Sequence, residues 1–225
     1  MKSQEQVLYN INKIGKDILF IHIPKTAGTS IHKSFLDNNL YNLHMNKSGR
    51  LRHLSSESMI KILGKDSYNS YHTFSVVRNP WDRYVSNWRF LVEKKIDMKI
   101  RKLRSKASGK KYKRAIKQYM AIKNSNFETF LRMDLEENRF GNENRAAWLV
   151  DQYKYISNED NILVNKILRF ESIKHDFYKE FKFKLTSIEI NKTTREDYSY
   201  YYNNKTKNIL GDFYKKDIDM FNYRF

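Results

Sequence analysis

The chain has no cysteine, two prolines and seven glycines among its 225 residues. Without cysteine it can form no disulfide, bind no zinc through thiolates and use no thiol nucleophile. The scarcity of proline and glycine favours helices and strands over a loop-rich architecture. No apolar run approaches the roughly 20 residues of a membrane-spanning helix, and the first fifteen residues lack the apolar core of a signal peptide. We therefore expect a soluble, cytoplasmic protein without a membrane span.

The sequence is rich in apolar and aromatic residues. Hydrophobic residues make up 40% and aromatic residues 15% of the sequence, which argues against wholesale disorder despite 30% charged residues. A chain of this length is large enough to bury a substantial core and suits a single domain. No linker divides the sequence, so we expect one domain over residues 1–225.

The positive charge is unevenly distributed. Of the net charge of +18, about two thirds comes from residues 94–123, which hold thirteen Lys and Arg against one acid, Asp97. A local basic segment of this kind favours a site for a polyanion over non-specific nucleic-acid binding, so we expect no nucleic-acid partner. A solvated charged face is an equally good interpretation. We expect a basic helical insert at about residues 94–126.

One motif follows an apolar, strand-like run at residues 18–23. Residues 24–30 read Pro-Lys-Thr-Ala-Gly-Thr-Ser, and a helix begins there. A turn of this type directs backbone N–H groups and the positive end of a helix at a phosphate. It is not a Walker A loop, because Lys25 precedes Gly28 instead of following the glycines. Hydrolysis of ATP or GTP is therefore disfavoured.

A second motif follows the β-rich run at residues 72–77. Arg78 ends this run, and Trp81, Val85 and Trp88 recur at helical spacing after it, with Ser86 on the same helix. A guanidinium fork and a hydroxyl suit a terminal phosphate. Two anion sites at the ends of two strands suit a ligand with phosphates at both ends.

Strands alternate with helices along the chain. A third apolar run at residues 162–170 precedes a helical stripe of Ile173, Phe177 and Phe181. Further helical stripes are expected at Ile31, Phe35 and Leu36, and at Ile209, Phe213, Ile218 and Phe221. The pattern predicts an α/β fold, a P-loop-like three-layer structure with a central, mainly parallel sheet flanked by helices. Ligands of such folds bind at the carboxyl ends of the strands.

At the two motifs the sequence resembles the sulfotransferases that use 3′-phosphoadenosine 5′-phosphosulfate (PAPS). It is most similar to the carbohydrate-modifying branch of the heparan and chondroitin uronosyl sulfotransferases and their small bacterial relatives, from about residue 18 to residue 225. The resemblance implies a bacterial enzyme that moves a sulfuryl group from PAPS to a hydroxyl, leaving 3′-phosphoadenosine 5′-phosphate (PAP), without a metal. It implies an oligosaccharide or polysaccharide acceptor, with an acidic one fitting the basic segment, while hydroxyls of small molecules, lipids and peptides remain alternatives.

The same resemblance implies roles for individual residues. Lys25 would neutralise charge on the leaving oxygen, and Arg78 with Ser86 would bind the 3′-phosphate. Lys192 or Arg195 would add a phosphate contact, although an ordinary charged loop explains both equally well. The loop that binds the 5′-phosphosulfate would consist of Lys25, Thr26, Ala27, Gly28, Thr29 and Ser30.

The acceptor hydroxyl needs a base, and histidine is the natural choice near neutral pH. His53 is the first candidate, because Arg-His-Leu-Ser at residues 52–55 resembles the His-x-Ser segment that holds the base in the uronosyl enzymes, and it would support in-line attack. His44 is the second candidate. We expect His22 to be structural and His32 to be solvated. Residues that would bind the acceptor are His44, Arg101, Arg104 and Arg114.

Two other classes of function remain as alternatives. One is a kinase or nucleotidase, which would need magnesium and ATP. The other is a non-enzymatic basic module that binds polyanionic glycan or nucleic acid through residues 94–123. The oligomeric state is left open by the sequence.

Overall fold

The computed structural model describes residues 9–11, 16–37, 53–95, 120–136, 150–159, 161–185 and 195–225. These residues form two compact units. The first unit is drawn from Met1–Asn79, Ala147–Ile190 and Lys215–Arg224, and the second from Pro80–Ala146, Asn191–Tyr214 and Phe225. The prediction of a single domain with a basic insert stays a prediction, because most of residues 94–126 lies outside the described part of the chain.

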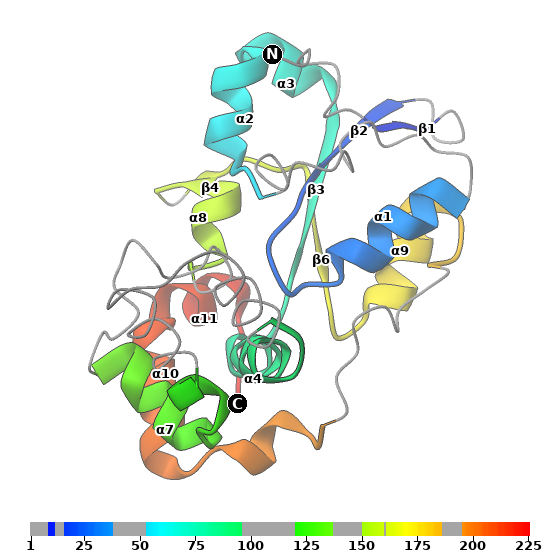
Figure 1. Cartoon of the computed structure of the whole chain (residues 1–225). Helices are drawn as coiled ribbons and strands as arrows, with labels where there is room; N and C mark the ends of the chain where they lie inside the picture. The colour runs from blue at the N-terminus through cyan, green and yellow to red at the C-terminus, as the bar shows by residue number, and fades with distance from the viewer. Residues whose placement is uncertain are drawn as a thin grey trace, which may run out of the picture. The chain divides into compact units, whose positions relative to one another are not determined.

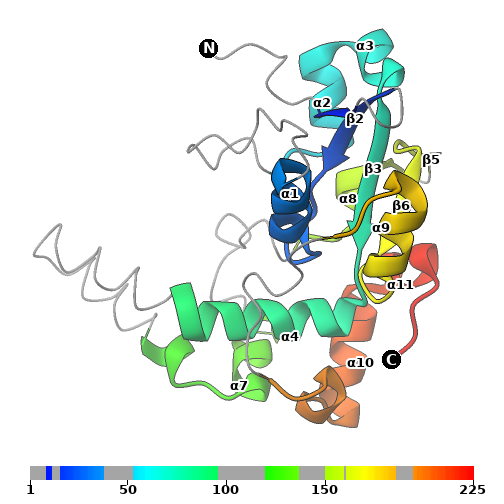
Figure 2. The ribbon, with the colours of Figure 1, turned by 90° about the vertical axis from the view of Figure 1, so that its right-hand side faces the viewer.

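The first unit contains a four-stranded sheet in the order β1-β2-β3-β6. Its strands are β1 (Tyr9–Ile11), β2 (Lys16–Ile21), β3 (His72–Val77) and β6 (Lys166–Arg169). β2, β3 and β6 are parallel neighbours, and β1 pairs antiparallel with β2 (Figure 1, Figure 2). The predicted mainly parallel sheet is confirmed.

Helices α1 (Gly28–Asp37) and α9 (Ile173–Phe181) cover one face of this sheet (Figure 1). Side chains alternate between the two faces of a strand, so Ile18 and Phe20 of β2 point to this layer. They pack with the buried residues Ile31, Phe35, Phe74, Val76, Leu168, Ile173, Phe177 and Phe181. The expected stripe of α9 is therefore confirmed.

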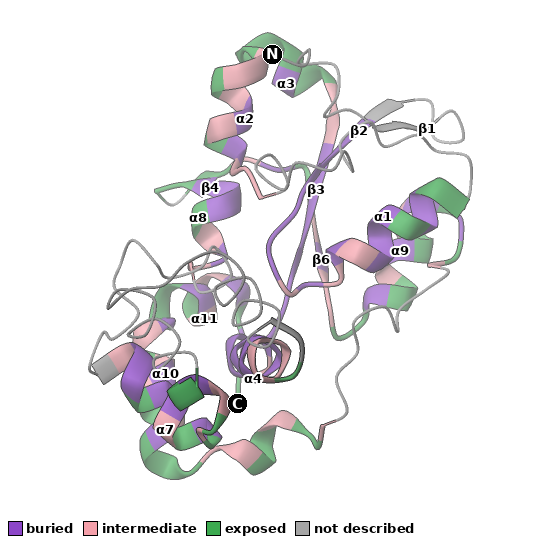
Figure 3. Ribbon diagram, viewed as in Figure 1, coloured by how far each residue is buried: buried purple, intermediate pink, exposed green. Residues whose placement is uncertain are grey.

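The other face of the sheet receives the intervening residues Leu19 and Ile21. The helices that pack there through buried residues are α2 (Ser56–Leu63), α3 (Lys65–Ser70), α8 (Tyr153–Ile156) and α11 (Lys215–Phe221). With helices on both faces, the first unit has three layers, and most of β3 is buried (Figure 3). The predicted α/β fold with flanking helices is confirmed.

Three expectations about the apolar pattern are corrected. Leu36 is 45% exposed, because the buried face of the short helix α1 is completed by Ile31 and Phe35. The strand expected at residues 162–170 is divided between β6 and β5 (Asn161–Ile162), which pairs with β4 (Ser157–Asn158) in a separate two-stranded sheet. Each correction comes from tertiary packing that a local apolar pattern does not contain.

The C-terminal stripe is the third correction. The chain forms two helices, α10 (Asn204–Phe213) and α11, with Tyr214 between them. The break changes the helical phase, so the buried apolar residues of this segment are Leu210, Tyr214 and Phe221, and of the expected stripe only Phe221 is buried. α10 belongs to the second unit and α11 to the first.

The second unit is helical where it is described. It contains α4 (Pro80–Phe90), which continues into a π-helix, η2 (Leu91–Lys95). Its other elements are α7 (Phe127–Leu131), the π-helix η3 (Arg132–Glu136), the 3₁₀ helix η5 (Tyr198–Tyr201) and α10. Within the described ranges, no helix is both long and apolar enough to cross a membrane.

Candidate active site

The carboxyl ends of the three parallel strands lie at one edge of the sheet of the first unit. The register places Ile21 beside Ser75 and Val77 beside Arg169. The segments that leave this edge are the turn after β2, Arg78 after β3, and Phe170 with Glu171 after β6. The topology therefore brings both sequence motifs to the same edge.

The turn after β2 has an unusual backbone. Lys25 and Ala27 have φ angles of 70° and 69°, in the left-handed region that non-glycine residues seldom adopt. The Thr26 hydroxyl donates to the Ile23 carbonyl at 2.8 Å, and the Ala27 carbonyl accepts from Ser30 N at 2.9 Å. Turns of this kind gather backbone N–H groups into a concave anion site. The strain of such residues is typical of a functional loop.

Gly28 is required by its neighbour His22. A Cβ atom at position 28 would lie 1.8 Å from Nε2 of His22. The His22 ring is buried and stacks on Phe20, with 5.4 Å between ring centroids. The glycine therefore lets α1 begin directly against a buried imidazole.

His53 contacts His22, which comes just before the same turn. Its Nδ1 is 3.1 Å from the His22 carbonyl oxygen, and the two rings are 4.5 Å apart. A carbonyl oxygen only accepts, so the hydrogen bond places the proton on Nδ1. In the neutral ring, Nε2 is then the basic nitrogen. This contact therefore fixes the tautomer of the neutral His53 ring.

The expectation that His32 is solvated is wrong. His32 is 4% exposed and packs edge-on against Phe20 and His22, at 5.6 and 5.5 Å between centroids. The face of α1 that carries it turns toward the sheet. His22 is buried in the sheet layer, in keeping with a structural role.

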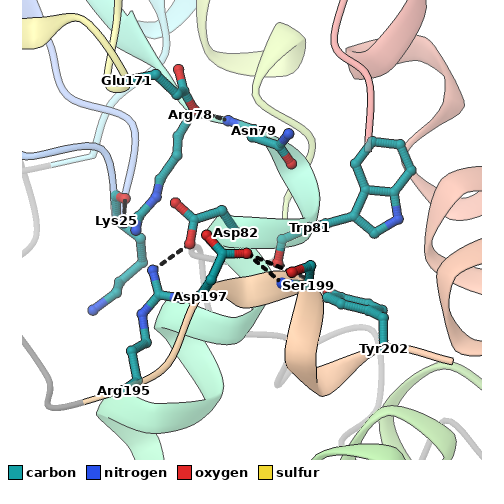
Figure 4. Close-up of polar contacts among 10 residues, drawn as sticks. All are labelled: Lys25, Arg78, Asn79, Trp81, Asp82, Glu171, Arg195, Asp197, Ser199 and Tyr202. Carbon is teal, nitrogen blue, oxygen red and sulfur yellow. Dashed lines mark hydrogen bonds and ion pairs between the residues drawn. The ribbon is translucent and has the colours of Figure 1, made fainter.

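Arg78 connects the segments that follow the three strands. Its Nη1 donates to the Lys25 carbonyl at 3.0 Å, and its guanidinium lies 3.8 Å from the ring centroid of Phe170. Figure 4 shows the Arg78 side chain extending toward Lys25. The residue is only 6% exposed. The two sequence motifs therefore meet in a direct contact within one unit.

Next to Arg78, the backbone of Asn79 is also held by a side chain. Its N–H donates to Oε1 of Glu171 at 2.6 Å (Figure 4). The Tyr223 hydroxyl donates to Oε2 of Glu171 at 3.2 Å. Burial, followed by the charge of Glu171, raises the pKa of Tyr223, so this phenol stays protonated. By accepting from these two donors, Glu171 fixes the position of the backbone at this edge of the sheet.

Two residues that the sequence interpretation missed hold the Arg78 backbone, Gln152 directly and Asp217 through Gln152. Gln152 hydrogen-bonds to both the N–H and the carbonyl of Arg78, and Asp217 accepts from the N–H groups of Gln152 and Tyr153. Neither belongs to a local motif. The signal available in the sequence is weak: a polar residue, Asp217, where the C-terminal helix presents its buried face.

In the second unit, Ser86 lies on the buried side of α4. Arg195 forms an ion pair with Asp82, and the Tyr202 hydroxyl donates to the Trp81 carbonyl at 2.9 Å (Figure 4). Burial raises the pKa of Tyr202 well above its ordinary value. The binding roles expected for Ser86 and Arg195 stay predictions.

The remaining site predictions fall outside the described residues. They concern Lys192 and the expected acceptor-binding residues His44, Arg101, Arg104 and Arg114. Among the residues that the structure does describe, no group of three or more His, Asp and Glu is placed to hold a metal ion.

A mainly parallel α/β sheet with strand-turn-helix segments at its carboxyl edge places the chain in a structural class whose ligands bind at that edge. Within this class, residues 13–224 match the sequence model of the sulfotransferase family, and the chain belongs to that family. It is a transferase of sulfuryl groups, and its family generally uses PAPS as donor. No curated protein and no solved structure matches the chain.

Proposed function

We propose that this sulfotransferase moves the sulfuryl group of PAPS to a carbohydrate hydroxyl, with His53 as the base. The observation that carries the proposal is the 3.0 Å contact between Arg78 Nη1 and the Lys25 carbonyl. It supports one donor site built from both motifs, since each motif has the chemistry of an anion site. PAPS carries anionic groups at the 5′ and 3′ positions.

In the proposed site, the turn from Lys25 to Ser30 binds the 5′-phosphosulfate. Its backbone N–H groups and the N-terminus of α1 favour negative charge. The Thr26 hydroxyl is engaged by the Ile23 carbonyl, so Thr26 contributes through its backbone. The Lys25 ammonium neutralises charge that develops on the leaving oxygen.

Arg78 binds the 3′-phosphate in this proposal, and Ser86 is its predicted partner. A guanidinium presents several N–H donors in a plane and suits a phosphate better than an ammonium does. Contact with Phe170 holds the guanidinium plane of Arg78 in place. ATP lacks a 3′-phosphate, so this contact gives selectivity for PAPS over ATP.

The reaction is a single in-line displacement. The acceptor oxygen forms a bond to sulfur while the bond between sulfur and the 5′-phosphate oxygen breaks. The acceptor proton passes to Nε2 of His53, and PAP leaves with the electron pair of the broken bond. The hydrogen bond from Nδ1 to the His22 carbonyl supports this assignment, because it leaves Nε2 as the basic nitrogen.

The carbohydrate acceptor is proposed from the resemblance of residues 52–55 to the His-x-Ser segment of the uronosyl enzymes. The basic residues 94–123 add a reason to try acidic glycans. A panel of uronate-containing oligosaccharides, with neutral sugars for comparison, tests this part separately from donor binding.

The first experiment is a calorimetric titration of the protein with PAP, AMP and ATP, without added metal. We expect PAP to bind at least about tenfold more tightly than AMP, the size of one charge-assisted contact. Arg78→Ala should remove this preference, and Lys33→Ala, on the exposed side of α1, should keep it.

Two results would contradict the proposal. Binding of ATP as tight as that of PAP would favour a kinase or nucleotidase. Binding of a polyanion that survives both Lys25→Ala and Arg78→Ala, and disappears when residues 94–123 are neutralised, would favour a basic binding module.

A further inference from the structure

The side-chain amide of Gln152 hydrogen-bonds to both the N–H and the carbonyl of Arg78. Its Oε1 accepts from Arg78 N at 2.9 Å, and its Nε2 donates to Arg78 O at 2.8 Å. The side chain is fully buried. Arg78 is the first residue beyond the paired part of β3, whose ladder with β6 ends at Val77. The amide of Gln152 thus supplies the two hydrogen bonds that a neighbouring strand would otherwise make.

Asp217 holds Gln152 in turn. Its carboxylate oxygens accept from Gln152 N at 2.8 Å and from Tyr153 N at 2.9 Å, at the start of α8. Asp217 is fully buried on α11. A buried carboxylate that accepts two backbone N–H groups sets the position of the chain it binds, because moving either donor leaves a charge poorly solvated.

These contacts form a continuous series through the first unit. They lead from α11, through Asp217 and Gln152, to the backbone of Arg78, and from its guanidinium to the Lys25 turn. Asp217, Gln152 and Arg78 are all buried, so a displacement at one end is transmitted by close packing. The C-terminal helix is therefore connected to the anion-binding edge.

We propose that Gln152 and Asp217 are positioning residues that set Arg78 for the 3′-phosphate of the donor. This inference rests on the proposed function, because it needs Arg78 to bind that phosphate. A planar guanidinium recognises phosphate only in a narrow range of orientations. Small shifts of its backbone should therefore weaken recognition of the 3′-phosphate more than they weaken the 5′-phosphate loop.

The test compares Gln152→Met with Asn165→Ala. Gln152→Met keeps the side-chain size but removes both hydrogen bonds to Arg78. Asn165 makes the corresponding contact at the opposite end of β3, where its Oδ1 accepts from Thr73 N at 2.8 Å, so its replacement is a matched control. Thermal melting verifies that both variants fold, and calorimetry gives Kd for PAP and AMP.

We expect Gln152→Met to raise Kd for PAP about tenfold, and Kd for AMP less than about threefold. Asn165→Ala should lower Tm and leave both constants within about twofold. Hydrogen exchange at the Arg78 amide, measured without ligand, should accelerate in Gln152→Met only. Asp217→Asn keeps one acceptor for the two N–H groups, so we expect a smaller increase in Kd for PAP, again with little change for AMP. It serves as the second variant if Gln152→Met does not fold.

The inference is overturned if PAP and AMP weaken equally in Gln152→Met, or if Asn165→Ala has the same selective effect. Failure of the proposed function looks different. In that case the unmodified protein already shows no preference for PAP over AMP, and both proposals are overturned. If the unmodified protein prefers PAP and Gln152→Met keeps that preference, only the positioning role is overturned.

Discussion

The sheet edge of the first unit and the aromatic core of the second unit depend on different contacts. At the sheet edge of the first unit, side chains hydrogen-bond to backbone groups, as Gln152 does to Arg78 and Glu171 to Asn79. The second unit is packed by aromatic rings, with centroids 5.4 Å apart for Trp88 and Phe127 and 4.8 Å for Phe127 and Tyr202. Hydrogen bonds fix the direction of a chain, whereas ring contacts mainly bury area. Substitutions that remove these hydrogen bonds at the edge should therefore alter function, and those among the rings should alter stability.

The largest effect should come from Lys25→Ala. Loss of the ammonium removes charge stabilisation from the leaving oxygen, and we expect kcat to fall by about 100-fold or more. The measurement is turnover of PAPS, with Kd for PAP beside it. Lys33→Ala, also near the loop but exposed on α1, is the control. Full turnover in Lys25→Ala would mean that the turn does not bind the reacting group.

Gly28→Ala should act on stability at the same edge. The new methyl group collides with the His22 ring, and we expect the free energy of unfolding to fall by about 1–3 kcal/mol in urea. Gly64→Ala measures the cost of backbone strain without a steric clash. Gly64 has φ of 83° and open space around its Cβ position, so only the left-handed conformation is penalised there. An unchanged free energy of unfolding in Gly28→Ala would contradict the packing argument.

Tyr84→Phe tests the second unit. The hydroxyl donates to Oδ2 of buried Asp134 at 2.8 Å, and burial together with Asp134 raises the pKa of Tyr84 well above its ordinary value, so the donor stays protonated. Its removal should lower the free energy of unfolding by about 1–3 kcal/mol and leave Kd for PAP unchanged. Tyr200→Phe, at an exposed position, should change neither. Weaker PAP binding in Tyr84→Phe would contradict the assignment of this hydrogen bond to stability alone.

The smallest effect concerns acid stability in the first unit. Burial raises the pKa of Asp176, but hydrogen bonds from Ser172, His175 and the Arg169 amide outweigh burial and hold that pKa below the ordinary value of 3.8. A lowered pKa stabilises the folded state above that value, and the contribution is lost as the pH falls below it. Asp176→Asn should therefore flatten the decline of Tm below about pH 4. An unchanged acid profile would show that these hydrogen bonds carry no net stabilisation.

Local patterns predicted much of the first unit. β3 begins and ends where the β-rich run does, and the stripe of Ile173, Phe177 and Phe181 is buried on α9. Both are continuous apolar patterns whose period matches one element. The pattern failed at Leu36 and at the C-terminal stripe, where a short helix and a change of helical phase decide which side chains are buried.

For the candidate site, the sequence identified the segments but not their contacts. Lys25 and Arg78 belong to recognisable motifs, and the parallel topology brings those motifs to one edge. His32 was expected in solvent because a helix position alone does not say which face meets the sheet. Gln152 and Asp217 have no motif, since each acts through partners 74 and 65 residues away along the chain.

The sequence by itself determined the family, the alternation of strands and helices, and the two motifs that follow the first two parallel strands. These depend on residue type and short spacing, which local geometry translates directly into structure. Only the tertiary structure decided that Arg78 contacts Lys25, that His53 leaves Nε2 as its basic nitrogen, and that the C-terminal helix holds the edge in place. Those features arise from hydrogen bonds between distant segments, whose partners are chosen by how the chain packs.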